Sequence, residues 1–296
     1  MSLITHSVRA AFFVAAIALA TQGAATLSAA PPKAPKTAAA PAAKPKPLSG
    51  IPKAESRNND RSWAERQKIL NQRAKEGGFD VMFIGDSITH YWEWHGKDVW
   101  AKRLAPYRPA NFGIGGDQTG HVLWRLKNGN LSSKTNPKLI ILLIGTNDTG
   151  HSHANIEAQR VASGVKAIIT ELQSRTRAKI LLFAIFPRDI SPEHPFRKKN
   201  EEINALIAKF ADNNRVFYKD INKSFLDANG WGRKGVMRDR EFLHPGEWGY
   251  NIWADALIPE IKTHLGPNYK PATEANAQPA SPKQGGNSKP AKKTKV

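Results

Sequence analysis

Residues 79–88 read FDVMFIGDSI, an apolar run that stops at Gly85 and continues directly into Asp86 and Ser87. A buried strand that ends at a small residue can present the next hydroxyl group at the open edge of a sheet. In open α/β sheets, ligands bind in the crevice at the carboxyl ends of the strands. Because Gly-Asp-Ser is also ordinary turn chemistry, the role of Ser87 depends on which residues stand at the ends of the other strands.

Short apolar blocks and helical patterns alternate along the chain. The blocks at 139–144 and 180–186 are almost continuously apolar, as expected of strands that are covered on both faces. Apolar residues recur at helical spacing over 156–172, 203–210 and 248–257. This alternation predicts one α/β domain, with a parallel sheet between two layers of helices. The five predicted strands are 79–84, 110–114, 139–144, 180–186 and 216–218.

Composition predicts one folded domain at 50–266 within the 296-residue chain. Residues 1–25 combine Arg9, a short apolar stretch and small residues, which is the pattern of a signal peptide. The cleavage site follows either Ala25 or the later Ser-Ala-Ala at 28–30. We therefore expect an exported protein, periplasmic or extracellular.

Two basic arms flank the predicted domain. Residues 26–49 and 267–296 are rich in alanine, proline and lysine, so they bury too little apolar surface to fold, and we expect a disordered linker and a disordered basic tail. The formal charge of the chain is +19, of which residues 1–48 and 267–296 each hold +5. This distribution suits association of the arms with envelope polyanions and does not indicate a nucleic-acid partner.

The chain contains no cysteine. Disulfides, thiolate metal sites, thiol nucleophiles and lipidation at an amino-terminal cysteine are therefore all excluded. We expect no metal and no other cofactor. The oligomeric state does not follow from the sequence.

Polar groups suited to acyl transfer follow the second and third predicted strands. The block NFGIGGD at 111–117 brings the bare backbone of Gly116 to the sheet edge, and GTND at 145–148 brings Asn147. Either block can simply close a turn. In the functional interpretation, the backbone N–H groups of Ser87 and Gly116 and the Asn147 amide form a three-donor oxyanion hole.

The segment DREFLHP at 239–245 precedes the last predicted helix and supplies a candidate base, His244. A free serine hydroxyl attacks esters poorly at neutral pH, so Ser87 needs such a base. A carboxylate on the same loop can orient the imidazole ring. Glu241 lies three positions before the histidine and Asp239 lies five positions before it.

Four blocks in order resemble the SGNH/GDSL hydrolase superfamily, and most closely the catalytic subunits of platelet-activating factor acetylhydrolase. The resemblance covers about residues 60–262. It implies a three-layer α/β/α flavodoxin-like fold, the SGNH hydrolase fold, with a five-stranded parallel sheet of order 2-1-3-4-5. The blocks are FIGDS at 83–87, NFGIGGD at 111–117 with HVLWRL at 121–126, GTN at 145–147 and RKKN at 197–200.

The resemblance also implies residue roles: Ser87 as nucleophile, Gly116 and Asn147 as oxyanion donors, and His244 as base. The family usually has aspartate where Glu241 stands. We predict that Glu241 is the third member of the triad, with Asp239 as the alternative.

Resemblance and the export signal together predict a serine esterase that hydrolyses short-chain O-acyl esters, mostly O-acetyl groups on carbohydrate, through an acyl-enzyme intermediate. The substrate is then a small-molecule or polysaccharide acyl ester. Trp92, Trp94 and Trp231 fall in predicted loops, where they either stack on sugar rings or anchor those loops to the core. Two alternatives remain open: a lysophospholipase or thioesterase, and a non-catalytic glycan-binding envelope protein.

Overall fold

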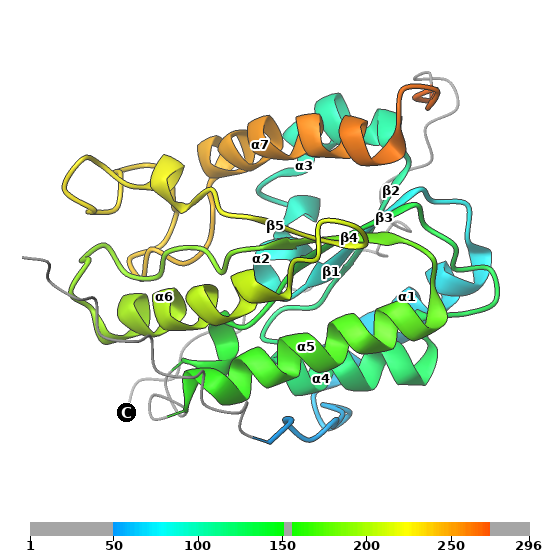
Figure 1. Cartoon of the computed structure of the whole chain (residues 1–296), viewed down its shortest axis with the longest axis horizontal. Helices are drawn as coiled ribbons and strands as arrows, with labels where there is room; N and C mark the ends of the chain where they lie inside the picture. The colour runs from blue at the N-terminus through cyan, green and yellow to red at the C-terminus, as the bar shows by residue number, and fades with distance from the viewer. Residues whose placement is uncertain (1–49, 151–155, 273–296) are drawn as a thin grey trace, which may run out of the picture. The chain divides into compact units, whose positions relative to one another are not determined.

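The computed structural model describes residues 50–150 and 156–272, and its centre is a five-stranded parallel sheet. The strand order is β2-β1-β3-β4-β5, which confirms the predicted order (Figure 1). All five predicted strands are present, with bounds that differ by at most three residues. They are β1 Val81–Gly85, β2 Pro109–Gly113, β3 Leu139–Leu143, β4 Lys179–Phe183 and β5 Val216–Lys219.

The register of the sheet aligns the strand ends that matter for chemistry. Gly85, the last residue of β1, lies opposite Gly113 in β2 and Leu143 in β3. Because all pairs are parallel, the carboxyl ends of the strands share one edge of the sheet. The segments that follow β1, β2 and β3 therefore start side by side at this edge.

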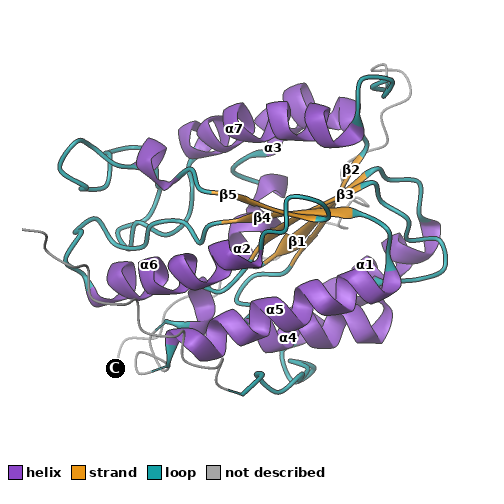
Figure 2. Cartoon of the chain, in the orientation of Figure 1, coloured by secondary structure: helices purple, strands orange, loops and turns teal. Residues whose placement is uncertain are grey.

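Helices cover both faces of the sheet (Figures 1 and 2). One face carries α1, α4, α5 and α6, and the other carries α7 and α3. In β3, Ile140 and Leu142 enter the core on the first face and Ile141 the core on the second, so both faces are apolar. The longer helices are α1 Arg61–Glu76, α4 Thr119–Arg125, α5 Ala158–Arg175, α6 Pro195–Ile207 and α7 Glu247–Leu265.

Short helical segments connect these elements. Two of them, η4 and η7, extend a longer helix, and α2, η5 and η8 begin within three residues of a strand end. They are α2 Ser87–His90, η1 Tyr91–Glu93, α3 Lys97–Val99, η2 Trp100–Leu104, η3 Ala105–Tyr107, η4 Leu126–Asn130, η5 Thr146–Asp148, η7 Ala208–Phe210 and η8 Asn222–Phe225.

Helix α1 was not predicted from apolar spacing. Half of its buried side chains are polar or charged, and these hide the helical pattern. The helix begins after Asp60, whose carboxylate accepts the backbone N–H groups of Ser62 and Trp63 at 3.0 and 3.2 Å. Its buried residues are Trp63, Arg66, Gln67, Leu70, Arg73 and Ala74.

Residues 267–272 belong to the folded domain, although composition assigned them to the disordered tail. The Tyr269 hydroxyl donates to the Asp80 carboxylate at 2.9 Å, and the Ala272 N–H donates to the Pro106 carbonyl at 2.7 Å. Asp80 also binds the guanidinium of Arg108. One aromatic side chain with a buried partner therefore extends the domain beyond the end of α7. Asp80 and Arg108 directly precede β1 and β2, so this contact lies at the amino edge of the sheet.

No helix in the described ranges combines the length and the apolar character needed to cross a membrane. The predicted signal peptide at 1–25, the linker at 26–49 and residues 273–296 of the tail lie outside the described residues. Their assignments stay predictions.

Candidate active site

Ser87 and His244 come together at the carboxyl edge of the sheet. The Ser87 Oγ lies 2.8 Å from the His244 Nε2, although 157 positions separate the two residues. Ser87 opens α2 two residues after the end of β1, and the Asp86 carboxylate caps this helix by accepting the Ile88 N–H at 2.9 Å. This geometry suits proton transfer from the hydroxyl to the imidazole.

Gly85 makes the turn before Ser87 sterically possible. A Cβ atom at this position would lie 2.2 Å from the Thr89 Oγ1 and 2.4 Å from the Leu143 carbonyl oxygen. Any larger residue would therefore push α2 away from the end of β3. The close approach explains why the strand ends in glycine.

The carboxylate that binds the imidazole belongs to Asp239. Its Oδ2 contacts the His244 Nδ1 and also accepts the His244 backbone N–H at 3.1 Å, while its Oδ1 accepts the Leu243 N–H at 2.8 Å. Burial raises the pKa of Asp239, but these hydrogen bonds outweigh it, and the pKa lies below its usual value. Asp239 is therefore an anion that fixes the ring orientation of His244.

The prediction that Glu241 orients the ring is wrong. Its carboxylate is 55% exposed and lies 3.5 Å from the Arg188 Nη2. The reason is a tight turn: the Phe242 N–H donates to the Asp239 carbonyl at 3.3 Å, and Phe242 adopts a left-handed φ of 46°. This turn folds Asp239 back onto His244 and directs Glu241 toward Arg188. The available signal was the tendency of aspartate to bind backbone N–H groups a few residues ahead.

The two other predicted oxyanion donors lie at the same edge. A Cβ atom on Gly115 would lie 3.8 Å from the Ser87 Cβ, and the next residue, Gly116, has a left-handed φ of 78°. The Asn147 side-chain amide donates to the Asp117 carbonyl at 3.0 Å. The structure thus brings Ser87, Gly116 and Asn147 into neighbouring segments, as the sequence predicted.

Arg57 supports the glycine segment and was missed by the sequence reasoning. Its Nη1 donates to the Gly115 carbonyl at 2.8 Å and lies 3.5 Å from the Asp117 carboxylate. A Cβ atom on Gly116 would lie 3.0 Å from the same nitrogen. The arginine therefore fixes the Gly115 carbonyl through a hydrogen bond. Arg57 lies before the first helix and belongs to none of the four sequence blocks, so no motif identifies it.

Buried charged groups lie beneath the serine. Arg125 donates to the Asp117 carboxylate at 2.7 Å and to the Gly85 carbonyl at 3.2 Å, which ties α4 to the end of β1. Asp148 accepts the Thr119 hydroxyl at 2.6 Å. Burial raises the pKa of Asp86 to about 7 and that of Asp148 to about 6. Two carboxyl groups beneath the serine, those of Asp86 and Asp148, therefore have pKa values well above the usual range of aspartate.

The predicted tryptophans occupy different environments. Trp92 is 1% exposed and packs 5.2 Å from the ring of Trp253, so it belongs to the core. Trp94 is 44% exposed and lies 5.3 Å from the ring of Tyr91, which in turn lies 5.0 Å from the His244 ring. Trp231 is exposed on the loop before the histidine segment. Of the three, Trp94 is connected to the site through an aromatic contact.

Over residues 50–150 and 156–272, no group of three or more histidine, aspartate and glutamate side chains is arranged to hold a metal ion. The residues around Ser87 form a different kind of site: a hydroxyl, an imidazole and a carboxylate in line, next to backbone and amide N–H groups. This arrangement suits nucleophilic attack on an acyl group.

Known proteins share both sequence and fold with this chain. The sequence profile of the GDSL-like Lipase/Acylhydrolase family matches residues 83–252. Platelet-activating factor acetylhydrolase IB subunit alpha1 of Homo sapiens is 33% identical over 219 residues, which cover 73% of this chain and 87% of that protein. Subunit alpha2 of Rattus norvegicus is 36% identical over 202 residues, or 67% of this chain and 82% of that protein.

Two solved structures are similar to this chain in fold. The acetyl xylan esterase AlAXEase is 26% identical with a TM-score of 0.50, and the match covers 62% of this chain and 99% of that one. A GDSL-like lipase from Bacteroides thetaiotaomicron has the same fold at 20% identity, with a TM-score of 0.54 and coverage of 69% and 97%. The predicted resemblance is confirmed: the chain belongs to the GDSL-like lipase/acylhydrolase family and is an ester hydrolase.

Proposed function

We propose that the protein is an exported serine esterase that removes short acyl groups, chiefly acetyl, from carbohydrate through an acyl-enzyme intermediate. The observation that carries the chemistry is the contact of 2.8 Å between Ser87 Oγ and His244 Nε2, with Asp239 on the opposite ring nitrogen. Such an arrangement makes a serine hydroxyl nucleophilic at neutral pH.

The reaction proceeds in two halves. Ser87 Oγ attacks the acyl carbon while His244 Nε2 takes the hydroxyl proton. The tetrahedral oxyanion accepts hydrogen bonds from the N–H groups of Ser87 and Gly116 and from the Asn147 amide. The ester C–O bond then breaks, and the alcohol leaves with the proton from His244. Water attacks the acyl-enzyme, gives a proton to His244, and releases the acid as Ser87 recovers its hydrogen.

Two independent observations support acetylated carbohydrate as the substrate. The relatives at 33–36% identity are named as acetylhydrolases, and the acetyl xylan esterase is similar in both sequence and fold. In this chain, the exposed indole of Trp94 lies beside Tyr91, which contacts the His244 ring. Exposed aromatic side chains of this kind suit stacking on sugar rings.

Replacement of the nucleophile tests the proposal. Ser87→Ala should abolish p-nitrophenyl acetate hydrolysis and labelling by a fluorophosphonate, while Ser133→Ala, an exposed serine elsewhere, should leave both unchanged. Acetate release would then be compared for acetylated xylan, peptidoglycan, small sugars and phospholipid. Unchanged turnover by Ser87→Ala would refute the nucleophile. Glycan binding without any ester turnover would favour the non-catalytic alternative.

A chain-length series separates the proposed esterase from a lysophospholipase or thioesterase. p-Nitrophenyl esters of two to sixteen carbons should be hydrolysed fastest at two to four carbons. A maximum at long chains would contradict the preference for short acyl groups.

Export is supported by the composition of residues 1–25, and the basic arms suit envelope polyanions. Cell fractionation with amino-terminal sequencing of the mature protein tests this. The expected new terminus follows Ala25 or Ala30. A cytoplasmic protein that retains Arg9 would contradict export.

A further inference from the structure

A cavity of about 430 Å³ lies apart from the serine, between α6 and η8. Its lining includes Ile185 and Pro187, which follow β4, and Asp220 and Asn222, which follow β5. It therefore opens at the same carboxyl edge of the sheet as Ser87. From β1 to β4 or β5 is two or three strand spacings, about 10–14 Å at the usual spacing. Cavities of this size hold small ligands.

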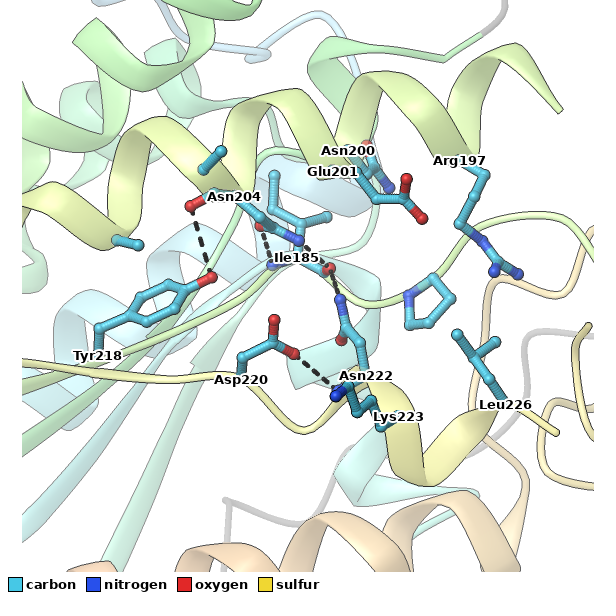
Figure 3. A pocket seen from close by; sticks show the side chains of 13 residues that line it. Ile185, Arg197, Asn200, Glu201, Asn204, Tyr218, Asp220, Asn222, Lys223 and Leu226 are labelled. Atoms are coloured by element: carbon cyan, nitrogen blue, oxygen red, sulfur yellow. Dashed lines mark hydrogen bonds between the residues drawn. The ribbon is translucent and has the colours of Figure 1, made fainter. Parts of the chain in front are cut away.

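One polar atom beside the cavity lacks a partner. The Asn222 side chain donates through Nδ2 to the Ile185 carbonyl at 3.0 Å, which fixes the orientation of the amide (Figure 3). Its Oδ1 is buried and accepts no hydrogen bond from the residues that the structure describes. A buried acceptor without a donor costs about 1–3 kcal/mol. Because this oxygen is closed off from the open space, the polar groups available to a ligand are the charged side chains of the lining.

The charged residues of the cavity favour a ligand rich in hydroxyl groups. Arg197 is occupied, because its guanidinium donates to the backbone carbonyls of three other residues, and it acts as a rigid wall. The carboxylates of Glu201 and Asp220 balance the cations of Arg197 and Lys223, so the lining carries no net charge and suits a neutral ligand. Glu201 lies on α6, across the cavity from the segment that carries Asn222 (Figure 3). Carboxylate and amide oxygens accept hydrogen bonds from ligand hydroxyl groups.

Arg197 also connects the cavity to the loop at 239–244 that carries His244. Arg197 donates to the Asp189 carbonyl, and the Asp189 N–H donates to the Glu241 carbonyl at 2.8 Å. Glu241 lies on the turn between Asp239 and His244. A ligand in the cavity would therefore sit beside the segment that holds the base in place.

We propose that this cavity binds one neutral sugar residue of a glycan chain, at a subsite several sugars away from the ester that Ser87 cleaves. The inference rests on the proposed action on carbohydrate esters and adds that the substrate is an oligomer or polymer. The Glu201 and Asp220 carboxylates would accept sugar hydroxyls, and Lys223 would donate to a ring or hydroxyl oxygen.

Filling the cavity mouth tests the proposal. Ala205 is exposed on α6 and lines the cavity, so Ala205→Trp should block it without disturbing the core; Ala101→Trp, at an exposed alanine outside the cavity, is the matched control. Catalytic efficiency, kcat/KM, would be measured on acetylated xylose and on acetylated xylo-oligosaccharides of two to six residues. We expect the native enzyme to gain at least about tenfold with length, and Ala205→Trp to lose that gain while its p-nitrophenyl acetate hydrolysis is unchanged.

A binding measurement keeps this inference separate from the esterase proposal. In the Ser87→Ala background, calorimetry with unacetylated xylo-oligosaccharides and with N-acetylglucosamine oligomers should detect binding of at least one series. Ala205→Trp should weaken it at least tenfold, and Glu201→Gln should weaken it measurably. The sugar subsite would be overturned if neither series bound, or if Ala205→Trp kept the gain in kcat/KM with oligosaccharide length. Binding of lysophosphatidylcholine that Ala205→Trp blocks would overturn it as well. Failure of Ser87→Ala to abolish ester hydrolysis would instead refute the catalytic assignment alone.

Discussion

Replacing Asp239 by asparagine should separate the two carboxylates of the histidine loop. Asparagine keeps one of the two oxygens, so it can accept either the Leu243 N–H, which Asp239 Oδ1 binds at 2.8 Å, or the His244 N–H, which Oδ2 binds at 3.1 Å. It removes the negative charge from the His244 Nδ1. The substitution therefore removes the charge and keeps one of the two side-chain hydrogen bonds to the turn. Glu241→Gln is the matched control, because it removes the same charge two residues away.

The expected loss follows from the charge that His244 gains during catalysis. Two opposite unit charges about 4 Å apart attract by about 4 kcal/mol at an effective dielectric constant near 20. Since about 1.4 kcal/mol corresponds to one decade in rate, the full interaction corresponds to about 10³. The Asp239 side chain is 24% exposed, so solvent screens part of it. We expect kcat/KM of Asp239→Asn to fall about 10²- to 10³-fold.

The assay is p-nitrophenyl acetate hydrolysis at pH 7–8, with circular dichroism to confirm folding. Glu241→Gln should stay within about threefold of the native enzyme, because its carboxylate contacts Arg188 and is largely in solvent. If Asp239→Asn retained a third of native activity while Glu241→Gln lost a hundredfold, the assignment of Asp239 to the triad would be wrong.

Three further changes test other parts of the site. Asn147→Ala should lower kcat on p-nitrophenyl acetate about 10²-fold or more with little change in KM, since an oxyanion donor acts in the transition state; a change confined to KM would contradict that role. Gly85→Ala should destabilise the fold by about 3 kcal/mol in urea, because a Cβ would lie 2.2 and 2.4 Å from its neighbours, whereas Gly50→Ala, with nothing within 4 Å, should be neutral; equal effects would disprove the steric argument. Asp86→Asn tests the raised pKa of Asp86, about 7. Between about pH 4 and pH 7 the folded native protein keeps a proton on this carboxyl group that the unfolded chain has lost. The free energy of unfolding of the native protein should therefore fall, relative to that of the variant, from about pH 4 to 7 and then stay level. A difference independent of pH would refute it.

The sheet and the meeting of Ser87 with His244 were predictable because strand ends are encoded locally. The first three apolar runs stop at glycine (Gly85, Gly115 and Gly145), and parallel strands bring those stops to one edge. The final helix needed only its apolar spacing and the proline near its start. The sequence separation of the two residues was therefore no obstacle, since topology determines their proximity.

Features that depend on individual side-chain directions were not predictable in this way. The left-handed backbone of Phe242 decides whether Asp239 or Glu241 faces His244. Phenylalanine rarely adopts this conformation, so the residue type does not indicate it. Trp92 and Trp94 lie two positions apart on a helical turn, so one enters the core and the other faces solvent. Neither outcome is visible in composition or spacing.

The contact of Tyr269 with Asp80 has a practical consequence for immobilisation of the enzyme and for its fusion to other proteins. It secures residues 267–272 at the amino edge of the sheet, whereas Ser87 and His244 lie at the carboxyl edge. A surface, resin or fusion partner joined beyond Ala272 would therefore be tethered behind the catalytic machinery. Oriented immobilisation through this end should leave the crevice facing the bulk solution, where large insoluble substrates would meet it.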